Sequence, residues 1–307
     1  MPIYVKQNRI LQNKVRYSLY PIDKNVITNH INSSTIAKLA NKTPSDRLVY
    51  SSQNPYGGVG DAGIWVRNPN CWLNGVANIS CFSPAQRSGA NWWQRGGTLI
   101  TRKHVLFAKH FVTSVLPNGG TPLIFVDENN NAIRRNIINY GYDLTDIAIA
   151  VLDQEVPSNI EIAKVLPPNY TEYLKISGLD DDMILAVGLD QEEKAILKRT
   201  SFVFGSYLVS DGQGGFVNVP NINVSNPLIT HPYYAFTETI IVGDSGNPVF
   251  IIIDNELVVL TTWWTPSTGP FITTRYDAVN AIINNLSPGE GYGLTPVDLE
   301  LVYYKYS

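Results

Sequence analysis

Short apolar runs, rich in β-branched residues and separated by turn residues, recur along most of this chain. Short runs with Gly, Pro and Asn between them indicate strands, and their even spacing is typical of barrels and sandwiches. One later segment, Tyr276–Leu286, instead has apolar residues at helical spacing. These patterns predict an all-β fold with a C-terminal helix. In the C-terminal half the predicted strands are 183–187, 201–208, 216–219, 240–242, 249–253 and 257–263.

The composition fits such a fold and argues against several classes of function. Hydrophobic residues make up 44% and charged residues 16% of the 307 residues, as in a globular chain that can bury a core. The net charge of −3 gives no basis for a nucleic-acid partner. No apolar run approaches the length of about 20 residues needed to span a bilayer. Residues 1–20 also lack the continuous apolar core of a signal peptide.

One turn carries a candidate nucleophile, in the sequence Gly243-Asp244-Ser245-Gly246-Asn247-Pro248. A serine hydroxyl needs a base to remove its proton before it attacks well. The turn must also direct backbone N–H groups at the oxyanion that forms when serine attacks a carbonyl. Glycine on both sides permits this backbone geometry. Because these residue types also favour ordinary β-turns, other segments must decide between the two interpretations.

Two upstream segments contain a candidate base and a candidate acid. Residues 96–110 form a predicted strand, a basic turn and a second apolar strand that ends at a histidine. Asp146 directly precedes the β-branched run Ile147–Leu152. A histidine can act as a general base near neutral pH, and a carboxylate can hold its imidazole in one tautomer. The alternatives are His104, which we expect to be solvated in the basic turn, and Asp143.

These segments resemble the trypsin/chymotrypsin-like serine proteases, in which the catalytic residues follow the chain order His, Asp, Ser. Subtilisin and the α/β-hydrolases have their catalytic residues in other orders. The matching stretches are GGTLITRKHVLFAKH, DIAIAVL and GDSGNP, within roughly residues 92–287. The resemblance implies two six-stranded antiparallel β-barrels of chymotrypsin type and a triad of His110, Asp146 and Ser245. It further implies an oxyanion hole made by the N–H groups of Gly243 and Ser245, and a peptide or protein substrate. It implies no cofactor and no metal.

The same resemblance assigns substrate-binding positions. The strand that ends at Trp263 resembles the family's substrate-pairing strand, in which Thr262 supports the catalytic acid through its hydroxyl. Trp264 and Phe271 stand where glycines normally leave the specificity pocket open, so the pocket is narrowed toward small side chains or closed. Alternatively, Trp264 packs on the surface of the second barrel. Thr239 matches the pocket floor, and without an acid there we do not expect cleavage after Arg or Lys.

We expect an N-terminal extension (1–90) that covers or extends the first barrel, which carries His and Asp (91–168). A second barrel with Ser and the helix (169–287) and a tail (288–307) complete the chain. Cys71 and Cys81 are either a disulfide or two free thiols. In zymogen members of the resembled family, the acid beside the serine pairs with a new N-terminus that cleavage creates. No Arg-Ile-Val-Gly-Gly sequence precedes Gly96, so a buried Asp244 needs another partner here.

Serine endopeptidase activity is therefore the predicted function. The alternative is a catalytically silent binding or structural protein on a protease fold, which Trp264, Phe271 and the unmatched extension favour. A third possibility is a protease that cleaves only itself or an assembly partner.

Overall fold

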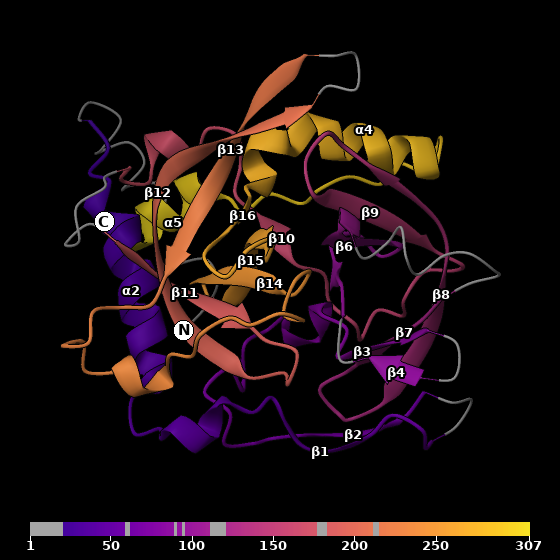
Figure 1. Cartoon of the computed structure of the whole chain (residues 1–307). Helices are drawn as coiled ribbons and strands as arrows, with labels where there is room; N and C mark the ends of the chain where they lie inside the picture. The colour runs from indigo at the N-terminus through magenta and orange to yellow at the C-terminus, as the bar shows by residue number, and fades with distance from the viewer. Residues whose placement is uncertain are drawn as a thin grey trace, which may run out of the picture.

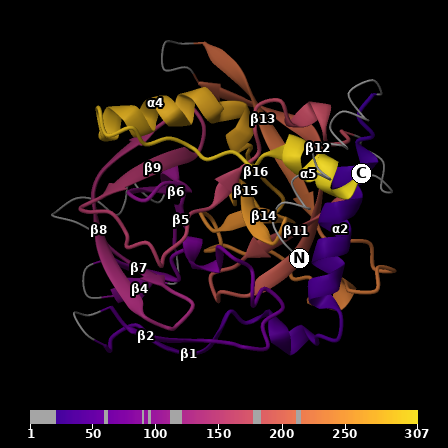
Figure 2. The same cartoon turned by 180° about the vertical axis from the view of Figure 1, so that it is seen from behind.

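The structure is a computed structural model that describes residues 21–58, 62–88, 91–93, 96–110, 121–176, 183–210 and 215–307. It is mostly β-structure with few helices, and its body consists of two seven-stranded sheets that lie side by side (Figures 1 and 2). The predictions of a β-rich fold and of a C-terminal helix are confirmed. Each sheet has seven strands and not the predicted six, short edge strands included. Closure of each sheet into a complete barrel stays a prediction.

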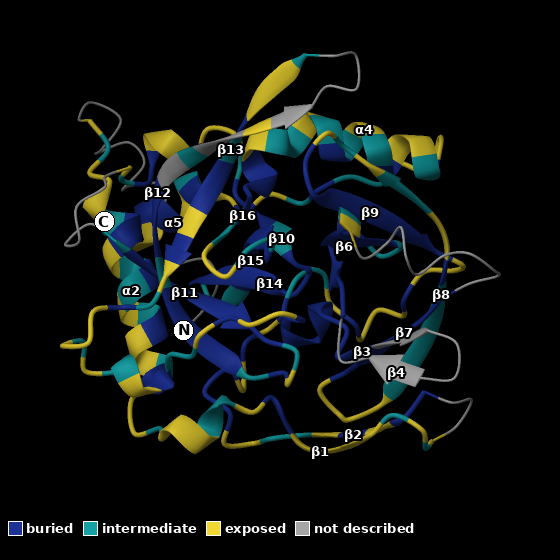
Figure 3. Cartoon of the chain, in the orientation of Figure 1, coloured by how far each residue is buried: buried dark blue, intermediate teal, exposed yellow. Residues whose placement is uncertain are grey.

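The first sheet is antiparallel throughout, with the order β4-β3-β7-β8-β9-β6-β5. Strands β6, β7 and β9 are buried at every position, as expected for apolar runs (Figure 3). Phe82 forms an isolated bridge with Thr98, and the Ser83 N–H donates to the Gly97 carbonyl over 2.9 Å. These contacts link the chain before β3 to the far edge strand, β5. The strands are β3 (Ala85–Ser88), β4 (Asn91–Trp93), β5 (Thr98–Leu99), β6 (His104–Ala108), β7 (Thr121–Val126), β8 (Ala132–Tyr142) and β9 (Ile147–Leu152).

The second sheet has the order β10-β15-β14-β11-β12-β13-β16, and all its pairs are antiparallel except β10 with β15. Strand β14 is buried throughout, and Asp254 and Asn255 connect it to β15 with positive φ angles of 55° and 67°. Such angles at both central residues are typical of tight hairpin turns. The strands are β10 (Lys164–Val165), β11 (Ile184–Leu189), β12 (Ala195–Ser210), β13 (Phe216–Ser225), β14 (Pro248–Ile253), β15 (Glu256–Thr262) and β16 (Thr268–Pro270).

Helices connect and cover the two sheets. Helix α4 (Tyr276–Leu286) has the predicted bounds, follows the second sheet in the chain and packs on β8 and β9 of the first sheet (Figure 1). Helix α2 (Asn25–Leu39) packs on β11, β14 and helix α5 (Leu299–Tyr306). The short 3₁₀ helices are η1 (Pro44–Arg47), η3 (Ile79–Cys81), η4 (Tyr170–Glu172), η6 (Tyr234–Phe236) and η7 (Ile272–Arg275). A separate hairpin joins β1 (Tyr50–Asn54) to β2 (Ile64–Arg67).

The predicted segments contribute elements to both sheets. Strand β3 lies inside the predicted extension and extends the first sheet, as expected for that segment, whereas α2 of the same extension packs on the second. Strand β10 lies inside the predicted first barrel but pairs with β15. Helix α5 lies in the predicted tail. Residues 1–20 lie outside the described residues, and no helix within the described ones is long and apolar enough to cross a membrane.

The two cysteines are free thiols. Both Cys71 and Cys81 are buried, and burial raises the pKa of each thiol, to about 11 for Cys71. Thiols held in the protonated form in this way are poor nucleophiles. Of the two alternatives left open by the sequence, the structure therefore has two thiols that act as small buried apolar side chains.

Candidate functional site

The pairing of β6 with β9 brings His110 beside Asp146. The register joins Ala108 to Ile147, so the residues just beyond that pair remain neighbours. The Lys109 N–H donates to the Asp146 carbonyl over 2.7 Å, which continues the pairing past the strand ends. Both strands are buried at every position, so this end of the sheet lies in the protein interior.

Both carboxylate oxygens of Asp146 accept hydrogen bonds from His110. The imidazole Nδ1 lies 2.8 Å from Asp146 Oδ2, and the His110 backbone N–H donates to Oδ1 over 3.1 Å. The acid side chain is 8% exposed, whereas the imidazole is 40% exposed. A carboxylate that accepts from Nδ1–H favours the tautomer with its lone pair on Nε2. The arrangement can therefore hold an accessible imidazole in the form that accepts a proton at Nε2.

The alternative acid, Asp143, has a different partner. Its Oδ2 lies 2.7 Å from Nε of Arg275, and its Oδ1 accepts from the backbone N–H of Thr145 over 2.7 Å. The structure thus places Asp146, and not Asp143, against the imidazole of His110.

The alternative base, His104, is fully buried at the start of β6, so the expectation that it is solvated is wrong. Its Nδ1 lies 2.8 Å from the Thr101 hydroxyl, and the ring of Tyr292 meets it edge-on at 5.2 Å. The C-terminal tail covers the basic turn, which local sequence could not indicate. Burial, with a smaller contribution from Lys103, lowers the pKa of His104 to about 4. This histidine is neutral at pH 7 and enclosed by protein.

The serine turn adjoins the start of β14 and depends on two glycines with positive φ. Gly243 has φ 112° and Gly246 has φ 86°, conformations that side chains with a Cβ rarely adopt. The Gly246 N–H donates to the Trp263 carbonyl over 2.9 Å, and the Trp263 N–H donates to the Asn247 carbonyl over 3.0 Å. These bonds continue the pairing of β14 with β15. Ser245 is partly exposed.

Two backbone N–H groups of this turn, those of Gly243 and Ser245, have no hydrogen-bond acceptor among the residues that the structure describes. Gly243 is buried, and buried N–H groups in proteins nearly always have a partner. Unpaired backbone donors beside the candidate nucleophile are the feature that an oxyanion hole requires.

Asp244, next to the serine, is 1% exposed. Each of its carboxylate oxygens accepts a hydrogen bond from a backbone N–H group. The N–H of Ile241 donates to its Oδ2 over 2.7 Å, and the N–H of Gln191 donates to its Oδ1 over 2.9 Å. These N–H groups are the partners that the sequence left unnamed. No sequence signal pointed to Gln191, because it lies in the distant turn between β11 and β12.

A second carboxylate organises the turn that contains Gln191. Asp190 Oδ1 accepts from the N–H groups of Glu192 and Lys194, each over 2.9 Å. Burial raises the pKa of Asp190 to about 6, and the nearby Asp244 adds to the rise, whereas the hydrogen bond and charge of Lys194 oppose it. The turn that holds Asp244 is therefore itself held by a buried carboxyl group.

The predicted substrate-binding residues lie in several environments. Thr239 is exposed, and Trp264 is half-buried. Thr262 is buried, but its hydroxyl has no hydrogen-bond partner among the described residues, so the expected support of the catalytic acid is not made. The two oxygens of Asp146 instead bond to His110.

Two predicted pocket residues pack in the interior of the second sheet. Trp263 is 1% exposed, and its Nε1–H donates to the Leu189 carbonyl over 2.9 Å. Phe271 is fully buried, with ring centroids 5.4 Å from Tyr170 and 5.8 Å from Phe202. Contact of Trp263 and Phe271 with a substrate stays a prediction. Of the three bulky residues, Trp264 is the most exposed.

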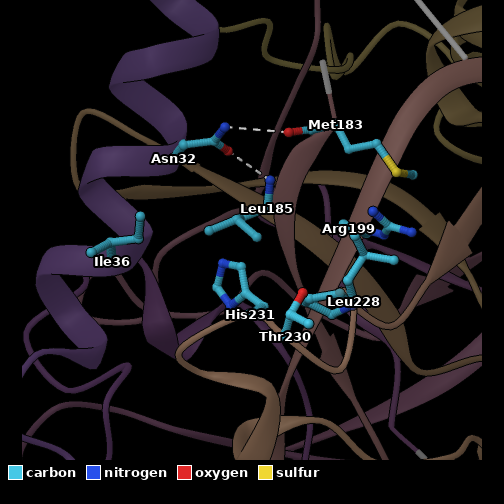
Figure 4. A pocket seen from close by; sticks show the side chains of 9 residues that line it. Asn32, Ile36, Met183, Leu185, Arg199, Leu228, Thr230 and His231 are labelled. Atoms are coloured by element: carbon cyan, nitrogen blue, oxygen red, sulfur yellow. Dashed lines mark hydrogen bonds between the residues drawn. The ribbon is translucent and has the colours of Figure 1, made fainter. Parts of the chain in front are cut away.

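A cavity of about 240 Å³ lies between α2 and the second sheet (Figure 4). It is apolar apart from a few polar groups, and the amide of Asn32 already bonds to the Met183 carbonyl and the Leu185 N–H, over 3.3 and 2.8 Å. None of the predicted catalytic residues lines it. Across the described part of the chain, no three His, Cys, Asp or Glu side chains cluster as metal ligands would.

Comparison with known proteins adds no assignment. No protein-family model matches this chain, and no curated protein matches it significantly.

Proposed function

We propose that this chain is a serine endopeptidase in which His110 is the general base, Asp146 the orienting acid and Ser245 the nucleophile. The observation that carries the proposal is the double hydrogen bond between His110 and Asp146, made with the imidazole exposed and the acid buried. Burial of the Asp146 carboxylate is unfavourable for folding stability, yet the pair leaves the imidazole of His110 accessible to a substrate.

The reaction follows from these roles. Nε2 of His110 accepts the proton of Ser245 as Oγ forms a bond to the peptide carbonyl carbon. The N–H groups of Gly243 and Ser245 donate to the oxyanion. When the tetrahedral intermediate collapses, the C–N bond breaks and the amine leaves with the proton from His110. Water then attacks the acyl-enzyme, again losing a proton to His110, and the acid product leaves as Ser245 regains its hydrogen.

The partners of Asp244 support a serine turn that is ordered without processing. Its two carboxylate oxygens accept from the N–H groups of Gln191, in the turn between β11 and β12, and of Ile241, in the segment before β14. No newly cut N-terminus is needed to satisfy this buried carboxylate. The proposed enzyme therefore needs no cleavage to order its serine turn.

The proposed specificity excludes a trypsin-like preference. Thr239, at the position of the pocket floor, carries no charge to pair with Arg or Lys. Trp264 narrows the entrance toward small side chains. A peptide library should therefore show no enrichment of basic residues before the cut, and strong enrichment of them would contradict this assignment.

A catalytically silent binding protein is the second candidate. The observation that favours it is the cavity in Figure 4, which lies between α2 and the second sheet and contains none of the proposed catalytic residues.

A fluorophosphonate probe distinguishes the two candidates. We expect covalent labelling at Ser245, identified by peptide mapping, and its loss in Ser245→Ala and His110→Ala. His231→Ala, at a half-buried histidine in the loop after β13, is the matched control and should label as the unmodified chain does. Absence of labelling in the folded, unmodified chain would reject the enzyme and favour the binding protein.

A further inference from the structure

The acid loop of the proposed site contains an ion pair between residues of different parts of the chain. Asp143 follows β8, and Arg275 ends η7, directly before α4. The Arg275 Nε lies 2.7 Å from Asp143 Oδ2, with the Asp143 side chain 5% exposed and the Arg275 side chain 26% exposed. A nearly buried carboxylate of this kind is strongly dependent on its cationic partner.

Asp143 in turn holds the backbone on both sides of Asp146. Its Oδ1 accepts from the N–H of Thr145 over 2.7 Å and from the Thr145 hydroxyl over 2.5 Å. The Thr145 Oγ1 accepts from the N–H of Ile147 over 3.1 Å, and the Asp143 N–H donates to the Ile147 carbonyl over 3.2 Å. These bonds enclose Asp146 in a closed loop, and none of them uses the Asp146 carboxylate, which bonds to His110.

The cation comes from the other half of the molecule. Helix η7 packs on β15 of the second sheet, and α4, which begins at the next residue, packs on β8 and β9 (Figure 1). Arg275 therefore joins the scaffold of the serine-bearing sheet to the loop that carries the acid of the first sheet.

We propose that Arg275 is a positioning residue of this site: through Asp143 it fixes the loop that aims the Asp146 carboxylate at Nδ1 of His110. The effect of Arg275 on catalysis rests on the proposed function, whereas its effect on the loop does not. Without the guanidinium, the Asp143 carboxylate turns toward water, Thr145 loses its anchor, and Asp146 holds one imidazole tautomer less well.

The test uses the full chain and two readouts. Arg275→Met removes the charge, Arg275→Lys keeps it, and Lys305→Met is the matched control. Lys305 makes a partly buried ion pair with Asp254, between α5 and the β14–β15 turn. The first readout is the long-range ¹H–¹⁵N spectrum of the histidine side chains at pH 8, which reports tautomers, with the His110 signals assigned through His110→Ala. The second is the rate of fluorophosphonate labelling, with unfolding temperatures measured alongside.

We expect the His110 signals to show the Nδ1–H tautomer in the unmodified chain and a mixture in Arg275→Met. Labelling should slow roughly tenfold in Arg275→Met, recover in part in Arg275→Lys, and stay unchanged in Lys305→Met even if its unfolding temperature falls equally. An unchanged tautomer in folded Arg275→Met would overturn the positioning role, as would equal slowing in both Met variants. If the unmodified chain is not labelled but the tautomer responds to Arg275, the proposed function fails and the positioning role stands.

Discussion

The acid–base pair and the serine turn of the proposed site are held in different ways. In the first sheet, His110 and Asp146 bond to each other at adjacent ends of two buried strands. In the second sheet, the backbone around Ser245 is held by a buried neighbour, Asp244, which bonds to the N–H of the distant Gln191. The first arrangement is set by strand register, whereas the second depends on a contact between two loops. Changes to the serine turn should therefore affect activity through backbone conformation.

The largest effect is expected for Gly243→Val. At φ 112° a β-branched residue is strained, and its Cβ would meet the side chain of Gln191. The turn should shift and misdirect an oxyanion donor, so labelling at Ser245 should slow by roughly 100-fold or more while the fold is retained. Gly289→Val is the control, because Gly289 also has positive φ, at 77°, but a Cβ added there would meet no atom within 4 Å. Near-normal labelling of Gly243→Val would contradict the oxyanion assignment.

The two histidines of the first sheet differ in their surroundings, and pH tests that difference. His104 has a pKa lowered to about 4 by burial, so on acidification the unfolded chain binds a proton first. The neutral form of His104 contributes about 3 kcal/mol to the free energy of unfolding. This contribution is complete above about pH 6.5 and is lost as the pH falls toward 4. His104→Leu should remove this part of the pH dependence, measured by denaturant unfolding at pH 7 and pH 4.5. Parallel losses in the two proteins would show that His104 is not kept neutral.

Asp244→Ala tests how the serine turn is held. The change leaves the N–H groups of Ile241 and Gln191 without their acceptor, which should lower the free energy of unfolding by about 2 kcal/mol. Asp127→Ala is the matched control, since Asp127 is also 1% exposed and accepts from the N–H groups of Asn129 and Asn131 in the β7–β8 turn. Both variants should lose stability, but only Asp244→Ala should also slow labelling at Ser245, and by less than Gly243→Val does. If the two variants are labelled at equal rates, Asp244 is not needed for the reactivity of Ser245.

The smallest effect is expected for Trp264→Gly, which concerns specificity alone. If this ring narrows the pocket, its removal should raise cleavage after large apolar side chains relative to small ones by roughly tenfold, measured with a peptide library. An unchanged preference would support the alternative that Trp264 packs on the surface of the second sheet.

Local patterns predicted part of this molecule well. The helical spacing of apolar residues predicted α4 with its observed bounds, and the apolar runs before His110 and after Asp146 predicted the strands that join these residues. Helix α2 was not predicted, because its sequence is rich in Asn, Ser and Thr, which compete for backbone hydrogen bonds and favour turns.

The features that sequence reasoning missed all depend on distant contacts. Gln191 reaches Asp244, Arg275 reaches Asp143, and Tyr292 covers His104. Each partner lies in a loop or helix end whose own residues show no periodic pattern. Such contacts arise only in the folded chain, where segments far apart in the sequence pack together.

The most direct test of the account is the crystal structure of the chain after reaction with a fluorophosphonate. We expect a phosphorus–Oγ bond at Ser245, a phosphoryl oxygen within hydrogen-bond distance of the N–H groups of Gly243 and Ser245, and Nε2 of His110 facing Oγ. An adduct on another residue, or an imidazole of His110 that still bonds Asp146 but points away from Ser245, would contradict it.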